Sequence, residues 1–105
     1  MAVPGDEDEQ RQGFRLAFEA AADLDLEKVW IAYFSIGGKS GWMEVQAYVY
    51  GALSLPPIER DLLAHALNES LDALGVDGRR ATYSRALFLE AEEAEEAEEG
   101  ETGTK

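Results

Sequence analysis

Residues 55–75, LPPIERDLLAHALNESLDALG, constrain the fold most, because this stretch combines a helix start, a long helical period and a helix stop. Pro56 and Pro57 suit a first helical turn, where amide hydrogens lack intrahelical acceptors. Gly75 suits a left-handed C-cap, with Val76 folding back as in a Schellman motif. Apolar residues recur along one face: Ile58, Leu62, Leu67, Leu71 and Leu74. We expect the opposite face to lie in water: Glu59, Arg60, Asn68, Glu69 and Asp72.

The charge is concentrated at the end of the chain. The formal net charge of the 105 residues is −13, and 90–105 contribute −7 of it, from eight acidic residues and one basic residue. The sequence therefore predicts a disordered acidic leader over 1–13, one helical domain over 14–89 and a disordered Glu-rich tail over 90–105. The chain has no cysteine and no apolar run near the ~20 residues of a membrane span, so we expect a cytoplasmic protein that is not bound to a membrane.

Two helices are expected before the central one. Phe14, Ala17, Phe18 and Ala21 fall at i, i+3, i+4 and i+7, which predicts a first helix ending near residue 23. Asp25 then suits the N-cap of a second helix, LEKVWIAYFSI, that stops at the glycine pair 37–38.

The segment 28–50 permits two interpretations. Its β-branched and aromatic residues, with GGKSG between KVWIAYFSI and WMEVQAYVY, are also typical of a β-hairpin. Two short helices keep the apolar period equally well, and the neighbouring segments are helical by stronger signals. We favour helices.

A last helix is expected after the turn at Asp77 and Gly78, capped by Thr82 or Ser84 and running into the AEE repeats. The predicted fold class is thus all-α, a small bundle of four to five helices.

Aromatic residues crowd into residues 30–50, more than two short helices hide easily. An exposed remainder would form an apolar surface of the kind that binds partners or a second copy of the chain. The predicted interface residues are Trp30, Phe34, Trp42, Tyr48 and Tyr50. The sequence therefore predicts a regulatory or adaptor protein that is not an enzyme and needs no cofactor.

The only histidine, His65, lies in HALNESLDALG, which resembles the motif around the phospho-accepting histidine of histidine-phosphotransfer domains. That resemblance implies a phosphotransfer module using His65. Asn68 and Glu69 stand where the family has lysine and glycine, and a glutamate there adds bulk and repels a phosphoryl group. We favour a structural role, in which His65 lies at the edge of the apolar face of its helix. One histidine and no cysteine also make a metal site unexpected.

Ala47, Gly51, Leu53 and Ser54 form an A-x-x-x-G-x-L-S pattern that is similar to the turn of helix-turn-helix DNA-binding domains. The resemblance implies a DNA-binding regulator, yet the next helix offers only Arg60 between two acids. We therefore interpret 47–60 as a corner where two helices pack, and we do not expect nucleic acid as a partner. The dense basic cluster lies elsewhere: Arg79, Arg80 and Arg85, just before the acidic tail. That tail could cover the cluster, but we favour the interpretation that it only keeps the domain soluble.

Overall fold

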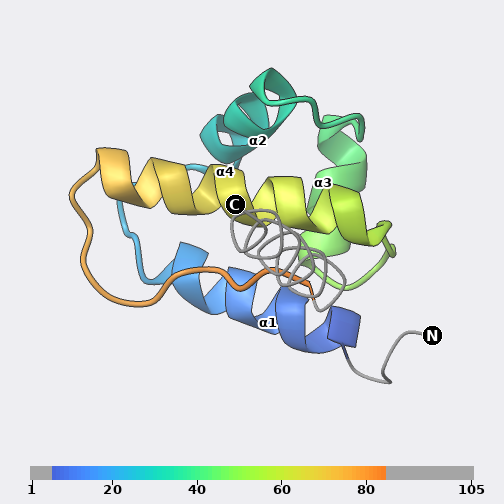
Figure 1. Cartoon of the computed structure of the whole chain (residues 1–105), viewed down its shortest axis with the longest axis horizontal. Coiled ribbons are helices and arrows are strands. Elements are labelled where there is room, and N and C mark those ends of the chain that lie inside the picture. The colour runs from blue at the N-terminus through green and yellow to red at the C-terminus, as the bar shows by residue number, and fades with distance from the viewer. Residues whose placement is uncertain (1–5, 85–105) are drawn as a thin grey trace, which may run out of the picture.

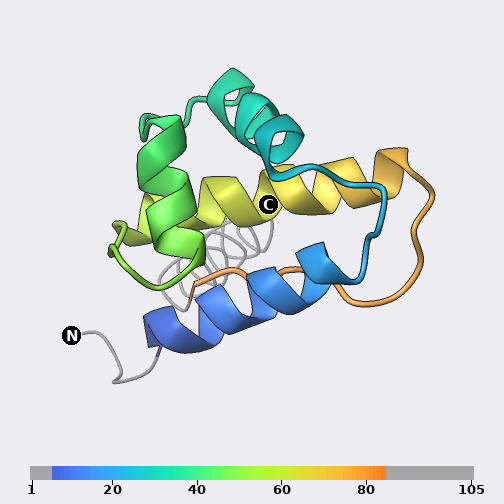
Figure 2. The same cartoon turned by 180° about the vertical axis from the view of Figure 1, so that it is seen from behind.

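The computed structural model describes residues 6–84. This part of the chain contains four helices and no strand: α1 (Asp6–Glu19), α2 (Leu26–Ser35), α3 (Trp42–Val49) and α4 (Pro57–Ala73). The all-α prediction is confirmed here, and 28–50 forms helices rather than a hairpin. Figure 1 shows α1 and α2 on opposite sides of α4, with α3 running across one end from the α2 side to the α1 side. The reverse view in Figure 2 shows the same arrangement.

The helix α4 provides the centre of the core. Leu63, Leu67 and Leu71 are fully buried on it, and Leu67 and Leu71 belong to the apolar face that the sequence predicted. The predicted Schellman ending is confirmed too: Gly75 has φ 71°, its amide donates to Asp72 O at 3.0 Å, and Val76 N donates to Leu71 O at 3.0 Å.

In the first turn of α4, the pattern of buried and exposed side chains is the reverse of the one that the sequence predicted. Ile58, expected in the core, is 61% exposed, whereas Glu59, Arg60 and Asp61 are buried at 8%, 7% and 5% exposure. Leu74 at the other end is also half exposed, at 50%. The apolar period predicts only the middle of the helix correctly, because polar partners from other segments cover its start.

The helix α1 begins seven residues before the predicted boundary at residue 13, so the prediction of a disordered leader is wrong for residues 6–13. Four acids, Asp6 to Glu9, occupy its first turn, where the partial positive charge of a helix N-terminus stabilises them. Gln10, which follows this turn, is 4% exposed, so the start of α1 packs against the rest of the molecule.

The connection from α3 to α4 is not the close helix crossing that the A-x-x-x-G pattern predicted. Gly51 adopts φ 87° and ends α3 in a second Schellman motif, with Ala52 N donating to Ala47 O at 2.7 Å. Gly51 and Ser54 are exposed, and residues 50–56 separate the two helices. The pattern therefore marks a helix stop.

Residues 76–84 run back from the end of α4 and lie alongside α1 in both views (Figures 1 and 2). Asn68 holds this segment through both polar atoms of its side-chain amide: Nδ2 donates to Ala81 O at 2.9 Å, and Oδ1 accepts from Ala81 N at 2.8 Å. The predicted last helix beyond this point lies outside the described residues, as does the Glu-rich tail.

Candidate functional site: an aromatic surface on α2 and α3

Three aromatic side chains from α2 and α3 form one continuous cluster. The ring centroids of Trp30 and Phe34 are 5.8 Å apart, and those of Trp30 and Trp42 are 6.1 Å apart. Both pairs are tilted, which is a favoured arrangement for aromatic rings. Phe34 is 61% exposed, while the two tryptophans are half-buried. We call Trp30, Phe34 and Trp42 the aromatic surface.

Two further apolar side chains beside the aromatic surface are exposed. Ile31, one turn before Phe34 on α2, is 52% exposed, and Met43, which follows Trp42, is 78% exposed. Single exposed apolar residues are ordinary, but neighbouring ones form the patches by which proteins bind one another. The sequence prediction named the aromatic residues and did not name Ile31 or Met43, because exposure of an aliphatic side chain leaves no sign in the periodicity.

The loop beneath the aromatic surface is held rigidly. Trp30 Nε1 donates to Ser40 O at 3.1 Å, so the indole is tied to the loop between α2 and α3. The fully buried Tyr33 donates its hydroxyl hydrogen to the Glu59 carboxylate and accepts from Ser40 N at 2.9 Å. Lys39 N also donates to Glu59, at 3.0 Å. Burial, reinforced by the hydrogen bond to Glu59, raises the pKa of Tyr33.

Tyr48 and Tyr50, the other two predicted interface residues, do not belong to the aromatic surface. Tyr48 is 1% exposed and lies in the core, with the Arg11 guanidinium 4.8 Å from its ring centroid. Burial raises the pKa of its hydroxyl to about 12. Tyr50 is 61% exposed, but it follows the other end of α3, where Arg15 of α1 lies 5.6 Å from its ring centroid. Of the five predicted residues, the structure therefore brings only three together.

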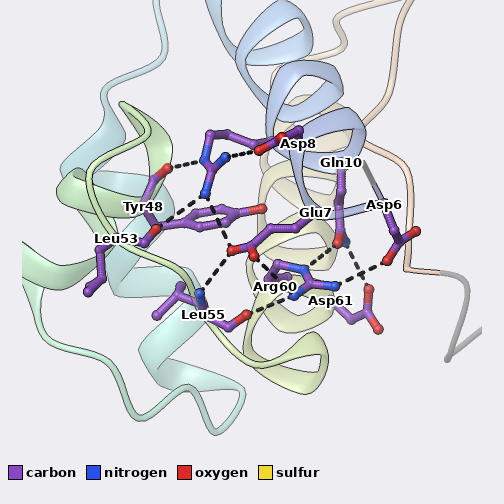
Figure 3. Close-up of polar contacts among 10 residues, drawn as sticks. Asp6, Glu7, Asp8, Gln10, Tyr48, Leu53, Leu55, Arg60 and Asp61 are labelled. Carbon is purple, nitrogen blue, oxygen red and sulfur yellow. Dashed lines mark hydrogen bonds and ion pairs between the residues drawn. The ribbon is translucent and has the colours of Figure 1, made fainter. Parts of the chain in front are cut away.

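A buried polar network between α1 and α4 was missed by the sequence analysis (Figure 3). Arg60 donates to Gln10 Oε1 at 2.8 Å, to Leu55 O at 2.8 Å and to Asp6 Oδ2 at 3.2 Å. Gln10 in turn donates to Asp61 Oδ1 at 2.9 Å. Every partner of Arg60 is an acceptor, so the planar guanidinium is satisfied on several sides.

Asp61 extends the network to the end of the described segment. Its two carboxylate oxygens accept from the amide and the hydroxyl of Ser84, both at 2.6 Å. Arg11 instead binds the last turn of α3 and the loop that follows it: Nε donates to Tyr48 O at 2.6 Å and Nη2 to Leu53 O at 3.3 Å (Figure 3). The contacts of Arg60, Gln10 and Asp61 explain the buried charges, because they satisfy polar groups that burial would otherwise leave unpaired.

His65 lies on the surface with both ring nitrogens engaged. Nε2 is 2.6 Å from Glu69 Oε1, and Nδ1 is 2.9 Å from the hydroxyl of Tyr83. A carboxylate only accepts, so Nε2 carries a hydrogen, and in the neutral imidazole Nδ1 accepts from Tyr83. Glu69 therefore occupies the direction from which a phosphoryl donor would approach Nε2.

Within the described residues, part of the predicted basic cluster is already held by an ion pair and hydrogen bonds. Arg80 donates to Asp72 Oδ1 at 2.9 Å and to Val76 O at 2.7 Å, so it is already neutralised within the fold. Arg79 is exposed. Arg85 lies outside the described residues, as does the acidic tail that could cover the cluster.

The described residues offer neither a metal site nor a membrane-spanning segment. Nowhere among them do three or more His, Asp or Glu side chains gather as metal ligands would. None of their helices has the length and apolar character needed to cross a bilayer. Comparisons of the chain with protein-family models, with curated proteins and with solved structures find no match.

Proposed function

We propose that this protein is a small cytoplasmic regulatory or adaptor protein, not an enzyme, that acts by binding a protein partner through the aromatic surface. The observation that carries the proposal is Phe34: its ring contacts Trp30, which contacts Trp42, and yet it is 61% exposed. Interfaces are enriched in such tryptophan and phenylalanine side chains. The rigid loop beneath supports the proposal, because a surface that is already ordered loses little entropy on binding.

Phe34 and Tyr50 provide a matched test, since both rings are 61% exposed and belong to different parts of the surface. The variants Phe34→Ser and Tyr50→Ser are compared with the wild type as bait for proteins from a cell lysate, followed by affinity measurement with the purified partner. We expect Phe34→Ser to weaken binding about tenfold or more, as truncation of a central aromatic does, and Tyr50→Ser to change it little. Equal binding by all three proteins would place the interface elsewhere.

A further inference from the structure

One face of α4 carries apolar side chains that are exposed near the start of the helix. Ile58, Leu62 and His65 stand at i, i+4 and i+7, so they share this face. Ile58 is 61% exposed, Leu62 is half-buried and the His65 side chain is 50% exposed. Tyr83, which is exposed, extends the face, with its ring centroid 6.3 Å from that of His65. We call these four residues the α4 outer face.

The described chain ends against this face. Ser84, the last described residue, is fully buried, and its amide and hydroxyl both donate to Asp61 at 2.6 Å. Asp61 stands one turn after Ile58 on α4. The residue before Ser84 is held there as well, because the Tyr83 hydroxyl lies 2.9 Å from His65 Nδ1. The chain beyond Ser84 therefore starts beside the α4 outer face.

The sequence that follows is apolar and long enough to reach the face. Residues 86–89, ALFL, hold every large apolar side chain of 85–105. Leu87 follows Ser84 by three positions, and three residues span up to about 10 Å when extended. Ile58 lies only one helical turn, about 5.4 Å along the axis, from the aspartate that binds Ser84. A segment attached so close to its target meets it at a high effective concentration.

We propose that residues 85–89 of the same chain bind the α4 outer face, with the apolar side chains of 86–89 covering Ile58 and Leu62. The face and the segment each carry apolar side chains that would otherwise remain in water, and their contact removes both from it. This surface is separate from the aromatic surface on α2 and α3, so the inference goes beyond the proposed function.

The charges around the α4 outer face limit the contact to the apolar residues. Glu69 follows His65 by one turn, and Asp6, in the acidic first turn of α1, pairs with the start of α4 at 3.2 Å. Arg85 is attracted to acidic surroundings, whereas the eight acids of 90–105 are repelled by them. The contact therefore ends at residue 89, and the Glu-rich run stays outside it.

Thiol reactivity tests this contact, because the chain has no cysteine of its own. Ile58→Cys places a single thiol on the α4 outer face of the full-length protein, and iodoacetamide measures how often it is exposed. We expect this thiol to react about tenfold or more slowly than the same thiol in a Leu87→Ser, Phe88→Ser background. Ile31→Cys, at a 52% exposed position on α2, is the matched control and should react within about twofold in the two backgrounds.

Equal reactivity of Ile58→Cys in the two backgrounds overturns the proposal. Protection that grows with protein concentration overturns it too, because the face would then be covered by a second copy of the chain. Val45→Cys, in the core, checks that the domain stays folded when Leu87 and Phe88 are replaced, and should remain unreactive. If it becomes reactive, the milder Leu87→Ala, Phe88→Ala background takes the place of the serine variants, with the same two outcomes.

Discussion

Gly38 and Tyr33 show how strongly single residues determine the loop under the aromatic surface. The Gly38 backbone packs against the Tyr33 ring, and its amide donates to Tyr33 O at 3.0 Å. A Cβ atom at this position would fall 2.3 Å from the ring, closer than any non-bonded carbon contact allows. Tyr33 is fully buried and held by hydrogen bonds from both sides, so it has no room to move away.

Gly38→Ala is therefore expected to lower the free energy of unfolding by about 1–3 kcal/mol, as overpacking of a tight site does. Gly13→Ala is the matched control. Gly13 lies inside α1, and a Cβ there would meet only Thr82 Oγ1 at an ordinary 3.5 Å. Because alanine favours helix more than glycine does, this second substitution should stabilise the protein by up to about 1 kcal/mol. Urea unfolding measures both, and a Gly38→Ala variant as stable as the wild type would contradict the packing described here.

Tyr48 predicts how stability depends on alkaline pH. Its pKa is raised from 10.0 to about 12 by burial, so the unfolded chain releases this proton before the folded chain does. The contribution of Tyr48 is complete below about pH 10 and is lost as the pH rises from about 10 to about 12, which amounts to about 2–3 kcal/mol. The pKa of Tyr33 is raised as well and adds a loss of the same sign.

Tyr48→Phe should remove the Tyr48 part of this loss. Relative to wild type, the variant should gain stability between about pH 10 and about pH 12, whereas at neutral pH no such gain is expected, since both states hold the proton there. Denaturant unfolding of both proteins at a series of pH values measures the difference. Parallel pH profiles for the two proteins would show that Tyr48 titrates alike in the folded and unfolded states.

At the scale of elements, α4 shows what the sequence predicts and what it does not. The middle of the helix and its glycine stop follow from local patterns, so the core residues Leu67 and Leu71 and the cap at Gly75 were predictable. The first turn was not, because the side chains that accept from Arg60, Gln10 and Asp6, lie about 50 positions away in the chain. No local period reports a contact with Gln10 or Asp6.

The candidate site, like α4, was predictable from the sequence only in part. The sequence named Trp30, Phe34 and Trp42 from their crowding, and the three do lie together. It grouped Tyr48 with them, although Tyr48 faces the core, because two short helices with aromatics on several sides give no clear apolar stripe. The acidic first turn of α1 was interpreted as a leader because its partner, Arg60, belongs to an element distant in the chain.

Arg60→Ala is predicted to destabilise the protein by about 3–5 kcal/mol, since it leaves the buried Gln10 side chain, the half-buried Asp6 side chain and Leu55 O without their donor. Arg60→Lys keeps the charge but not the planar fork, and should recover only part of this loss. A double-mutant cycle of Arg60→Ala with Gln10→Ala, followed by urea unfolding, should give a coupling of about 0.5–3 kcal/mol. Additive effects of the two substitutions would mean that the network does not join α1 to α4.

At the scale of the whole molecule, charge repulsion opposes the compact state. Within residues 6–84 there are fourteen acidic and seven basic residues, a net charge of −7, and the full chain reaches −13. Several of the seven cations are committed to ion pairs, among them Arg11, Arg60 and Arg80. The excess acids repel one another over distances at which salt screens effectively, whereas the buried pairs of Arg60 are screened much less.

Added sodium chloride is therefore predicted to stabilise the protein. Between about 0.02 and about 0.5 M the Debye length falls from about 20 to about 4 Å, so most of the repulsion disappears while the buried network stays intact. A gain of about 1 kcal/mol would raise the Tm by about 4–8 °C for a domain of this size.

A chain ending at residue 89 lacks −7 of the charge and should show a smaller increase, because fewer acids repel. Differential scanning calorimetry of both proteins, at concentrations low enough to keep them monomeric, measures the two increases. A Tm that falls with salt would mean that surface ion pairs, such as that of Arg80 with Asp72, outweigh the repulsion.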